Sequence, residues 1–235
     1  MLNRTALLNE LGIDVWVPRR AVETVAESLP APDIAPTREE LPTSTSPEWE
    51  PLAAQVSSCK KCALHTGRTQ TVFGEGNRQA KLMIVGEAPG AEEDKQGRPF
   101  VGRAGKLLNS MLLALGFQRE EVFIANILKC RPPQNRDPAT EEVAACKDYL
   151  RGQISLVAPE AILAVGRIAA QNLLDVDTPL GKMRGKTYHF LDERATREIP
   201  VLVTYHPAYL LRSPNEKRKT WEDLLQVKRS FRPDA

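Results

Sequence analysis

Long apolar runs are absent from this sequence. The N-terminal stretch MLNRTALLNELGIDVWVPRR has no uninterrupted apolar segment followed by a small-residue cleavage site, so we expect no signal peptide. No other stretch approaches the roughly 20 consecutive apolar residues that a membrane-spanning helix needs. We therefore expect a cytoplasmic protein, associated with the nucleoid if it binds DNA, with no membrane partner.

A strong net charge is also missing. The chain of 235 residues has a formal net charge of only +2, so no global electrostatic field points to nucleic acid. A local basic rim around a pocket would still be enough for DNA binding. The hydrophobic content of 42% is ordinary for a protein that buries a core, and the length suits one α/β domain with a tail. No internal repeat is present.

Cysteine is scarce, and its four positions are informative. In a reducing compartment four cysteines indicate a metal site rather than two disulfides. Four thiolates could enclose either a tetrahedral zinc ion or an iron–sulfur cluster, and their spacing does not choose between them. The alternative is that the last two are ordinary core cysteines. The chemistry suggested by the candidate pocket residues described below does not obviously need a metal, so we interpret the cysteine site as structural. Its candidate ligands are Cys59, Cys62, Cys130 and Cys146.

The composition changes twice along the chain. Residues 1–17 are typical of a short amphipathic segment, and residues 18–51 form a proline-rich stretch typical of a linker. From residue 52 to 235 the pattern is that of a folded domain.

Four short apolar runs within the domain predict buried strands, at 81–86, 122–127, 161–166 and 200–205. Helical patterns separate them: an apolar face that ends at Gly116, a helix from Thr140 toward Val157, and helices over 166–174 and 215–229. Strands that alternate with helices indicate a mostly parallel sheet covered on both faces. Ligands bind beyond the carboxyl ends of such strands.

Distinctive residues follow three of these strands. The run from Gly86 to Asp94 follows the first, Asn126 ends the second, and His206 follows the fourth. The glycine-rich run lacks the Lys-Ser/Thr of a phosphate-binding loop and the spacing of a dinucleotide fingerprint, so a nucleotide cofactor is not indicated. By itself the run is typical of a solvated acidic turn.

Several side chains near this edge have chemistry that suits a nucleobase. Phe100 could stack on a planar base, Asn126 could pair with a pyrimidine edge, and His206 could donate to a developing oxyanion. Each also has a plain structural interpretation, as a core aromatic, a backbone-bonding amide or a structural histidine. The loop that follows could insert apolar groups into a base stack and set a cation on phosphate, or could simply pack beneath the last helix. Its residues are Tyr209, Leu210, Leu211 and Arg212.

Taken together, the ordered motifs resemble the family-four uracil-DNA glycosylases over roughly residues 52–230. They are Cys59-x-x-Cys62, GEAPGAEED from Gly86, GRPFVGRAG from Gly97, NILKCRPP from Asn126, Cys146, and HPAYLLR from His206. The resemblance implies a three-layer α/β/α fold around a four-stranded parallel sheet. It also implies a 4Fe-4S cluster held by the four cysteines.

The same resemblance implies the site residues. The uracil pocket would be formed by Gly86, Glu87, Ala88, Gly90, Phe100, Asn126 and His206. Glu87 and Glu93 match acidic positions of the family's first motif, Asn135 matches a polar position after Arg-Pro-Pro, and His206 would contact uracil O2, so these four are the expected catalytic residues. A related branch traps its product through a histidine-bearing loop. Here the segment between Cys130 and Cys146 contains no histidine, so we expect turnover.

The expected activity is hydrolysis of the N-glycosidic bond of deoxyuridine in DNA by a monomer, with an abasic product and no lyase step. Rival hypotheses are activity on another deaminated base, a zinc protein without activity, and a silent DNA-binding or replisome module. The last rests on residues 1–20, because the stretch from Leu11 to Arg19 resembles the N-terminal peptide of the psi subunit of bacterial DNA polymerase III. An ordinary tail explains the same residues.

Overall fold

A computed structural model describes residues 48–193 and 196–231. The predicted amphipathic segment 1–17 lies outside them, as do most of the predicted linker and the possible docking peptide 1–20. The first described helix, α2 (Trp49–Ser57), begins inside the predicted linker 18–51. Trp49 is 1% exposed and packs in the core, so the folded part starts before the predicted boundary at residue 52.

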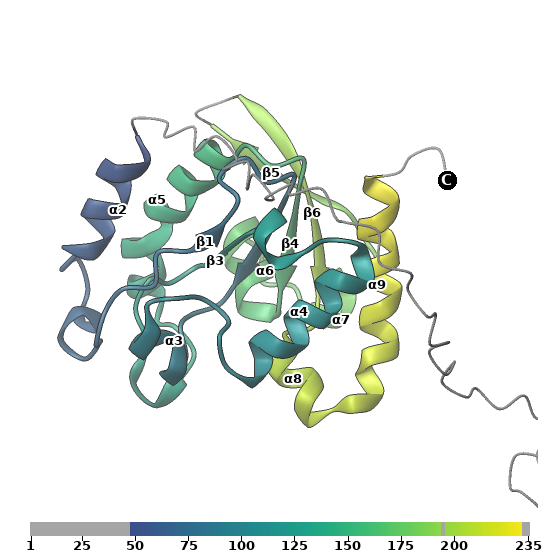
Figure 1. The fold of residues 1–235 in the computed structure, drawn as a ribbon, viewed down its shortest axis with the longest axis horizontal. Helices are drawn as coiled ribbons and strands as arrows, with labels where there is room; N and C mark the ends of the chain where they lie inside the picture. Colours follow the sequence, from purple (N-terminus) through teal and green to yellow (C-terminus); the bar gives the residue numbers. More distant parts are fainter. Residues whose placement is uncertain (1–47, 194–195, 232–235) are drawn as a thin grey trace, which may run out of the picture. The chain divides into compact units, whose positions relative to one another are not determined.

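One mixed sheet forms the centre of the domain, with strand order β1-β3-β2-β4-β6-β5 (Figure 1). Its four inner strands are parallel, which confirms the predicted sheet. They are β2 (Leu82–Gly86), β3 (Phe123–Asn126), β4 (Ala161–Val165) and β6 (Arg197–Thr204). Every residue of β2, β3 and β4 is buried, as expected for strands with helices on both faces.

Two antiparallel edge strands were not predicted. β1 (Glu75–Gly76) pairs with β3, and β5 (Tyr188–Asp192) pairs with β6. β1 is too short to produce a recognisable sequence pattern. β5 alternates between buried and exposed residues because only one face of this edge strand packs against the core. β6 also begins earlier than the predicted residue 200, so that Pro200 lies within the strand. A proline usually marks a strand boundary, and the pattern therefore did not indicate the three residues before it.

Helices cover both faces of the sheet, which confirms the three-layer α/β/α architecture. On one face, Met83 and Val85 pack with residues of α2, α5 (Thr140–Val157), α6 (Arg167–Leu174) and α7 (Leu180–Met183). On the other face, Leu82 and Ile84 pack with α4 (Arg103–Leu115), α8 (Pro207–Arg212) and α9 (Lys217–Ser230). Figure 1 shows α2 and α5 on one side of the sheet and α4 and α9 on the other.

The long helices begin and end close to the predicted residues. α4 ends at Gly116, whose φ of 92° is the left-handed conformation expected of a helix-terminating glycine. α5 spans the predicted range from Thr140 to Val157. None of the described helices has both the length and the hydropathy that crossing a bilayer requires.

Candidate active site and cysteine site

The carboxyl ends of the parallel strands open onto a cavity of about 410 Å³. The loop after β2 leads into α3 (Ala91–Gln96), which forms one wall, and α8 forms another. Most of the predicted site residues line this cavity: Glu87, Ala88, Gly90, Glu93, Phe100, Asn135, His206, Tyr209 and Arg212. The fold therefore brings together residues that lie up to 125 positions apart, from Glu87 to Arg212.

Gly86 and Asn126, which were predicted to form the pocket, do not line this cavity, but both lie beside Phe100, which does. A Cβ added at Gly86 would lie 2.4 Å from Asn126 Oδ1 and 2.6 Å from the Phe100 ring. The absence of a side chain at this position is thus what allows the amide and the ring to pack closely against the backbone of Gly86. Phe100 itself has a φ of 50°, an uncommon conformation for a phenylalanine, and its ring centroid lies 5.6 Å from that of His206.

Asn126 has an unsatisfied acceptor. Its side chain is 2% exposed, and its Oδ1 is buried without a hydrogen-bond partner in the described part of the chain. The Nζ of Lys129 donates to its backbone carbonyl at 2.8 Å, which holds the end of β3 in place. A buried acceptor without a partner is costly, and the cost is recovered when a ligand supplies a donor.

His206 is held as a neutral donor. Its Nδ1 accepts a hydrogen bond from the backbone N–H of Ala208 at 3.1 Å, so the ring proton belongs on Nε2. Burial lowers the pKa of His206 to about 4, and the nearby Arg212 acts in the same direction, while Glu93 opposes it. At neutral pH the imidazole is therefore uncharged and keeps one N–H available.

Glu87 lies in the cavity wall and titrates near neutrality. Burial raises its pKa to about 7, the charge of Asp137 adds to the increase, and Arg167 opposes it. Asp137 lines the same cavity and forms an ion pair with Arg167 at 2.7 Å. A carboxyl group with this pKa can exchange between its acid and base forms at working pH.

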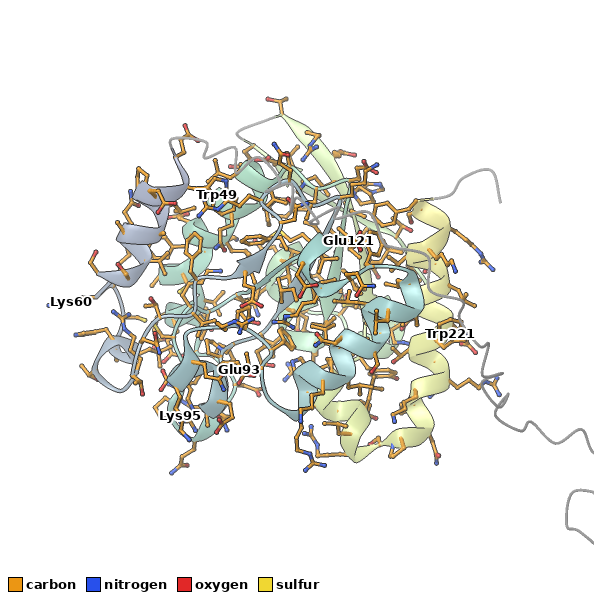
Figure 2. All side chains as sticks on the ribbon, viewed as in Figure 1. Trp49, Lys60, Glu93, Lys95, Glu121 and Trp221 are labelled. Atoms are coloured by element: carbon orange, nitrogen blue, oxygen red, sulfur yellow. The ribbon has the colours of Figure 1, made fainter. Side chains whose placement is uncertain are left out.

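Glu93 binds the loop that carries Phe100. Its Oε1 accepts hydrogen bonds from the backbone N–H groups of Val101 at 2.9 Å and Gly102 at 3.0 Å. Gly102 is the N-cap of α4, so this carboxylate joins α3 to the start of α4. Figure 2 shows Glu93 on the inner side of α3 and Lys95 on its outer side. These contacts show that Glu93 positions the Phe100 loop, and its catalytic role stays a prediction.

A third wall comes from the segment after β3. Asn135 lies there with a φ of 54°, and its Oδ1 accepts from Arg131 Nε at 2.8 Å. Arg136, beside it, is bound by both carboxylate oxygens of Glu142. Five further residues line the cavity and were not predicted: Ala104, Pro132, Arg136, Asp137 and Ala208. The charges of Arg136 and Asp137 after the Arg-Pro-Pro motif were a visible signal, but only the path of this segment decides that they reach the cavity.

The expected DNA-inserting loop is a short helix, α8, and this corrects one assignment. Tyr209 is 37% exposed and lines the cavity mouth together with Arg212. Leu210 is 1% exposed and packs in the core with α4 and α9, so it does not face DNA as expected. In a helix, adjacent side chains point in different directions, whereas the sequence analysis treated these residues as a loop whose side chains all face DNA. Leu211 is half-buried and does not line the cavity.

The four cysteines line a second, small cavity. They come from the segment after α2, from the residues after β3 and from α5, and the lining also includes Lys61, Arg68, Lys129 and Tyr149. Burial raises the pKa of the Cys130 thiol, and it raises that of Cys146 to about 11. Across the described residues, no group of three or more His, Cys, Asp or Glu side chains is placed to hold a single metal ion.

Comparison with known proteins places the chain in a family. Residues 73–225 match the family model described as the uracil DNA glycosylase superfamily. The chain is 44% identical over 180 residues to the type-4 uracil-DNA glycosylase of Archaeoglobus fulgidus, covering 75% of this chain and 89% of that protein. It is 43% identical over 197 residues to the type-4 enzyme of Thermotoga maritima, covering 83% and 96% of the two chains.

A type-5 uracil-DNA glycosylase, from Pyrobaculum aerophilum, is more distant. It is 33% identical over 175 residues, covering 68% of this chain and 74% of that protein. The higher identity to the type-4 enzymes agrees with the ordered family-four motifs. This chain belongs to the uracil DNA glycosylase superfamily, and within it to the type-4 uracil-DNA glycosylases.

Proposed function

We propose that this chain is a monofunctional uracil-DNA glycosylase of base excision repair, which hydrolyses the bond between uracil and deoxyribose and leaves an abasic site. The observation that carries the proposal is the buried, unpaired Oδ1 of Asn126, which lies beside Gly86 next to Phe100, and Phe100 lines the active-site cavity. The N3–H of uracil would satisfy this acceptor. Family membership supports the same reaction.

The base would be selected by shape and by hydrogen-bond pattern. Phe100 would stack on the ring while the amide of Asn126 pairs with N3–H and O4. Cytosine presents an unprotonated N3 and an amino group to the same amide, which is the wrong pattern. Thymine differs only by its C5 methyl group, which a closely packed pocket rejects by steric overlap.

Bond breaking leaves negative charge on uracil and oxocarbenium character on the sugar. His206, neutral and with its proton on Nε2, would donate to uracil O2 as the charge develops. Glu87, in its ionised form, would orient water or stabilise the cationic sugar. Glu93 would act indirectly, by fixing the loop of Phe100. The described residues that line the cavity include no lysine, which supports an abasic product without a Schiff-base lyase step.

The substrate would be a uracil-containing strand whose target base is turned out of the stack into the cavity. Tyr209 and Arg212 stand at the mouth, where an aromatic ring and a cation can meet the strand. Arg212 has no ion-pair partner in the described part of the chain, so its charge is available to a phosphate. Leu211 remains a predicted DNA contact.

We also propose that Cys59, Cys62, Cys130 and Cys146 hold a 4Fe-4S cluster. The donor set fits: four sulfurs line one cavity, and no carboxylate is among its described lining residues. A cluster of four irons is wider than one ion, which agrees with cysteines that share a cavity without converging on a single metal position. When bound, the cluster would tie three segments of the chain together, and the proposed hydrolysis uses only the side chains of the other cavity.

The test is a glycosylase assay on anaerobically purified protein. Labelled oligonucleotides with U opposite G, U opposite A, unpaired U, T opposite G, hypoxanthine or xanthine are incubated and then treated with hot alkali. We expect cleavage of the uracil strands alone, and only after alkali. Cleavage before alkali would contradict the monofunctional reaction. Cleavage of another deaminated base in preference to uracil, or of none, would overturn the proposed substrate.

A further inference from the structure

Arg68 makes a contact that the proposed base-excision chemistry does not use. Its Nη1 donates to the Sγ of Cys130 at 3.1 Å, and its Nη2 donates to the backbone carbonyl of Ser57 at 3.1 Å. The second bond anchors the guanidinium to the end of α2, so the first is directed rather than accidental. A guanidinium is always charged, and a sulfur accepts such a donor best as a thiolate, the form in which cysteine binds metal.

Arg68 stands apart from the other cations of the cysteine cavity. Lys61 lies over the Tyr149 ring, 4.9 Å from its centroid. The Nζ of Lys129 is used by the carbonyl of Asn126 and by Gln153 Oε1. Among the cationic side chains that line the described cavity, Arg68 is therefore the one that hydrogen-bonds a cysteine sulfur.

We propose that Arg68 is a positioning residue of the cysteine site, which hydrogen-bonds the Cys130 sulfur and raises the reduction potential of the iron–sulfur cluster that this cysteine helps to hold. The inference rests on the cluster in the proposed function. One electron added to a cluster increases the negative charge on its sulfurs. A fixed cation and a hydrogen bond at one sulfur stabilise that reduced state, and the potential rises.

The experiment measures iron content and midpoint potential on the full-length holoprotein, by voltammetry under anaerobic conditions. The variants are Arg68→Gln, which removes the charge, and Arg68→Lys, which keeps it with a single donor group. Arg78→Gln is the matched control, because Arg78 is also half-buried but pairs with Glu50 and lies over the Trp49 ring, away from the cysteines. We expect Arg68→Gln to shift the potential to a more negative value, Arg68→Lys to shift it less, and Arg78→Gln to leave it unchanged.

Each outcome bears on a separate claim. Wild-type protein without an iron–sulfur absorption band overturns the proposed cluster itself. A wild-type cluster with an unchanged potential in Arg68→Gln at full iron content overturns the role of Arg68 and leaves the cluster intact. If Arg68→Gln loses its iron, Arg68→Lys decides alone: a potential equal to that of the wild type contradicts the proposal, and a more negative one supports it.

Discussion

At the residue scale, the neighbours of His206 set its tautomer and its charge state. The backbone N–H of Ala208 occupies Nδ1, and burial lowers the pKa to about 4, so the ring stays neutral well below physiological pH. We predict that His206→Ala keeps the fold but lowers the single-turnover rate of uracil excision by roughly a hundredfold to a thousandfold, the usual effect of losing one oxyanion donor. Circular dichroism is the control for folding, and an unchanged rate would remove His206 from the mechanism.

Glu87 differs because its pKa of about 7 lies in the working range. If the ionised carboxylate is the active form, kcat/KM should fall about tenfold per pH unit below this pKa and reach a plateau above it. We predict that Glu87→Gln is slower and loses this step from its pH profile. Glu92→Gln is the control, because Glu92 lies exposed on α3 and pairs with Lys95. A rate that instead falls above pH 7 would show that the protonated acid is the active form.

Gly86 has no side chain, and this leaves room for its neighbours Asn126 and Phe100. A methyl group there would overlap Asn126 Oδ1 and the Phe100 ring, so Gly86→Ala should displace both groups. We predict a loss of uracil affinity, measured as weaker product inhibition by free uracil, together with a destabilisation of about 1–3 kcal/mol from overpacking. Gly181→Ala is the control, since a Cβ at Gly181 meets nothing within 4 Å. Equal inhibition of Gly86→Ala and wild type by uracil would contradict the proposed base contact.

At the scale of elements, hydrogen bonds join α9 to β6, the strand that precedes His206. Asp223 of α9 accepts from Arg184 at 2.7 and 2.9 Å and from the hydroxyl of Thr204, the last residue of β6, at 2.7 Å. The carboxylate is 3% exposed and Arg184 is 12% exposed. This arrangement sets the position of the strand end two residues before His206.

Breaking this buried group should be costly. We predict that Asp223→Ala lowers the free energy of unfolding by about 3–5 kcal/mol, because it leaves the Arg184 cation buried without its partner. Glu222→Ala on the same helix is the control: its ion pair with Arg218 is exposed, and its loss should cost about 1 kcal/mol or less. Denaturant titration measures both, and equal effects would show that the buried contacts do not stabilise α9.

α8 illustrates how an element decides the role of its residues. Its six residues turn Tyr209 and Arg212 toward the cavity mouth and Leu210 into the core. The outer face of the neighbouring α9 carries Trp221, 45% exposed, on the side away from the sheet (Figure 2). The sequence pattern of α8 showed only apolar residues beside a cation, and the helix geometry separates those that pack from those that are available.

At the scale of the whole molecule, the cysteine site brings together segments that lie outside the strands of the sheet. Cys59 and Cys62 lie in the stretch between α2 and the first strand, while Cys130 and Cys146 belong to the region from β3 to α5. We predict that removing iron with a chelator speeds amide hydrogen exchange over residues 56–68 and 128–149 and lowers the melting temperature, while β2 and β4 stay protected. Untreated holoprotein is the control. Identical exchange with and without iron would contradict a structural role for the cluster.

Much of this molecule was determined by local sequence. The four short apolar runs predicted buried strands, because no polar alternation interrupts them, and the helix between Thr140 and Val157 begins and ends where its residues indicate. The carboxyl edge of a parallel sheet then placed the residues after β2, β3 and β6 in one region. The family resemblance followed from the order of those motifs, which the comparisons confirm.

Tertiary structure alone decided how those residues act. The pKa of Glu87 depends on burial and on Asp137, which lies 50 positions away, and the side-chain oxygen of Asn126 is left buried without a partner beside Gly86, 40 positions before it. Glu93 became a link to the Phe100 loop, and Leu210 became a core residue, for the same reason. Sequence pattern specifies which side chains reach an edge of the sheet, whereas charge state, hydrogen-bond partners and exposure are set by neighbours that are distant in the chain and meet only when it folds.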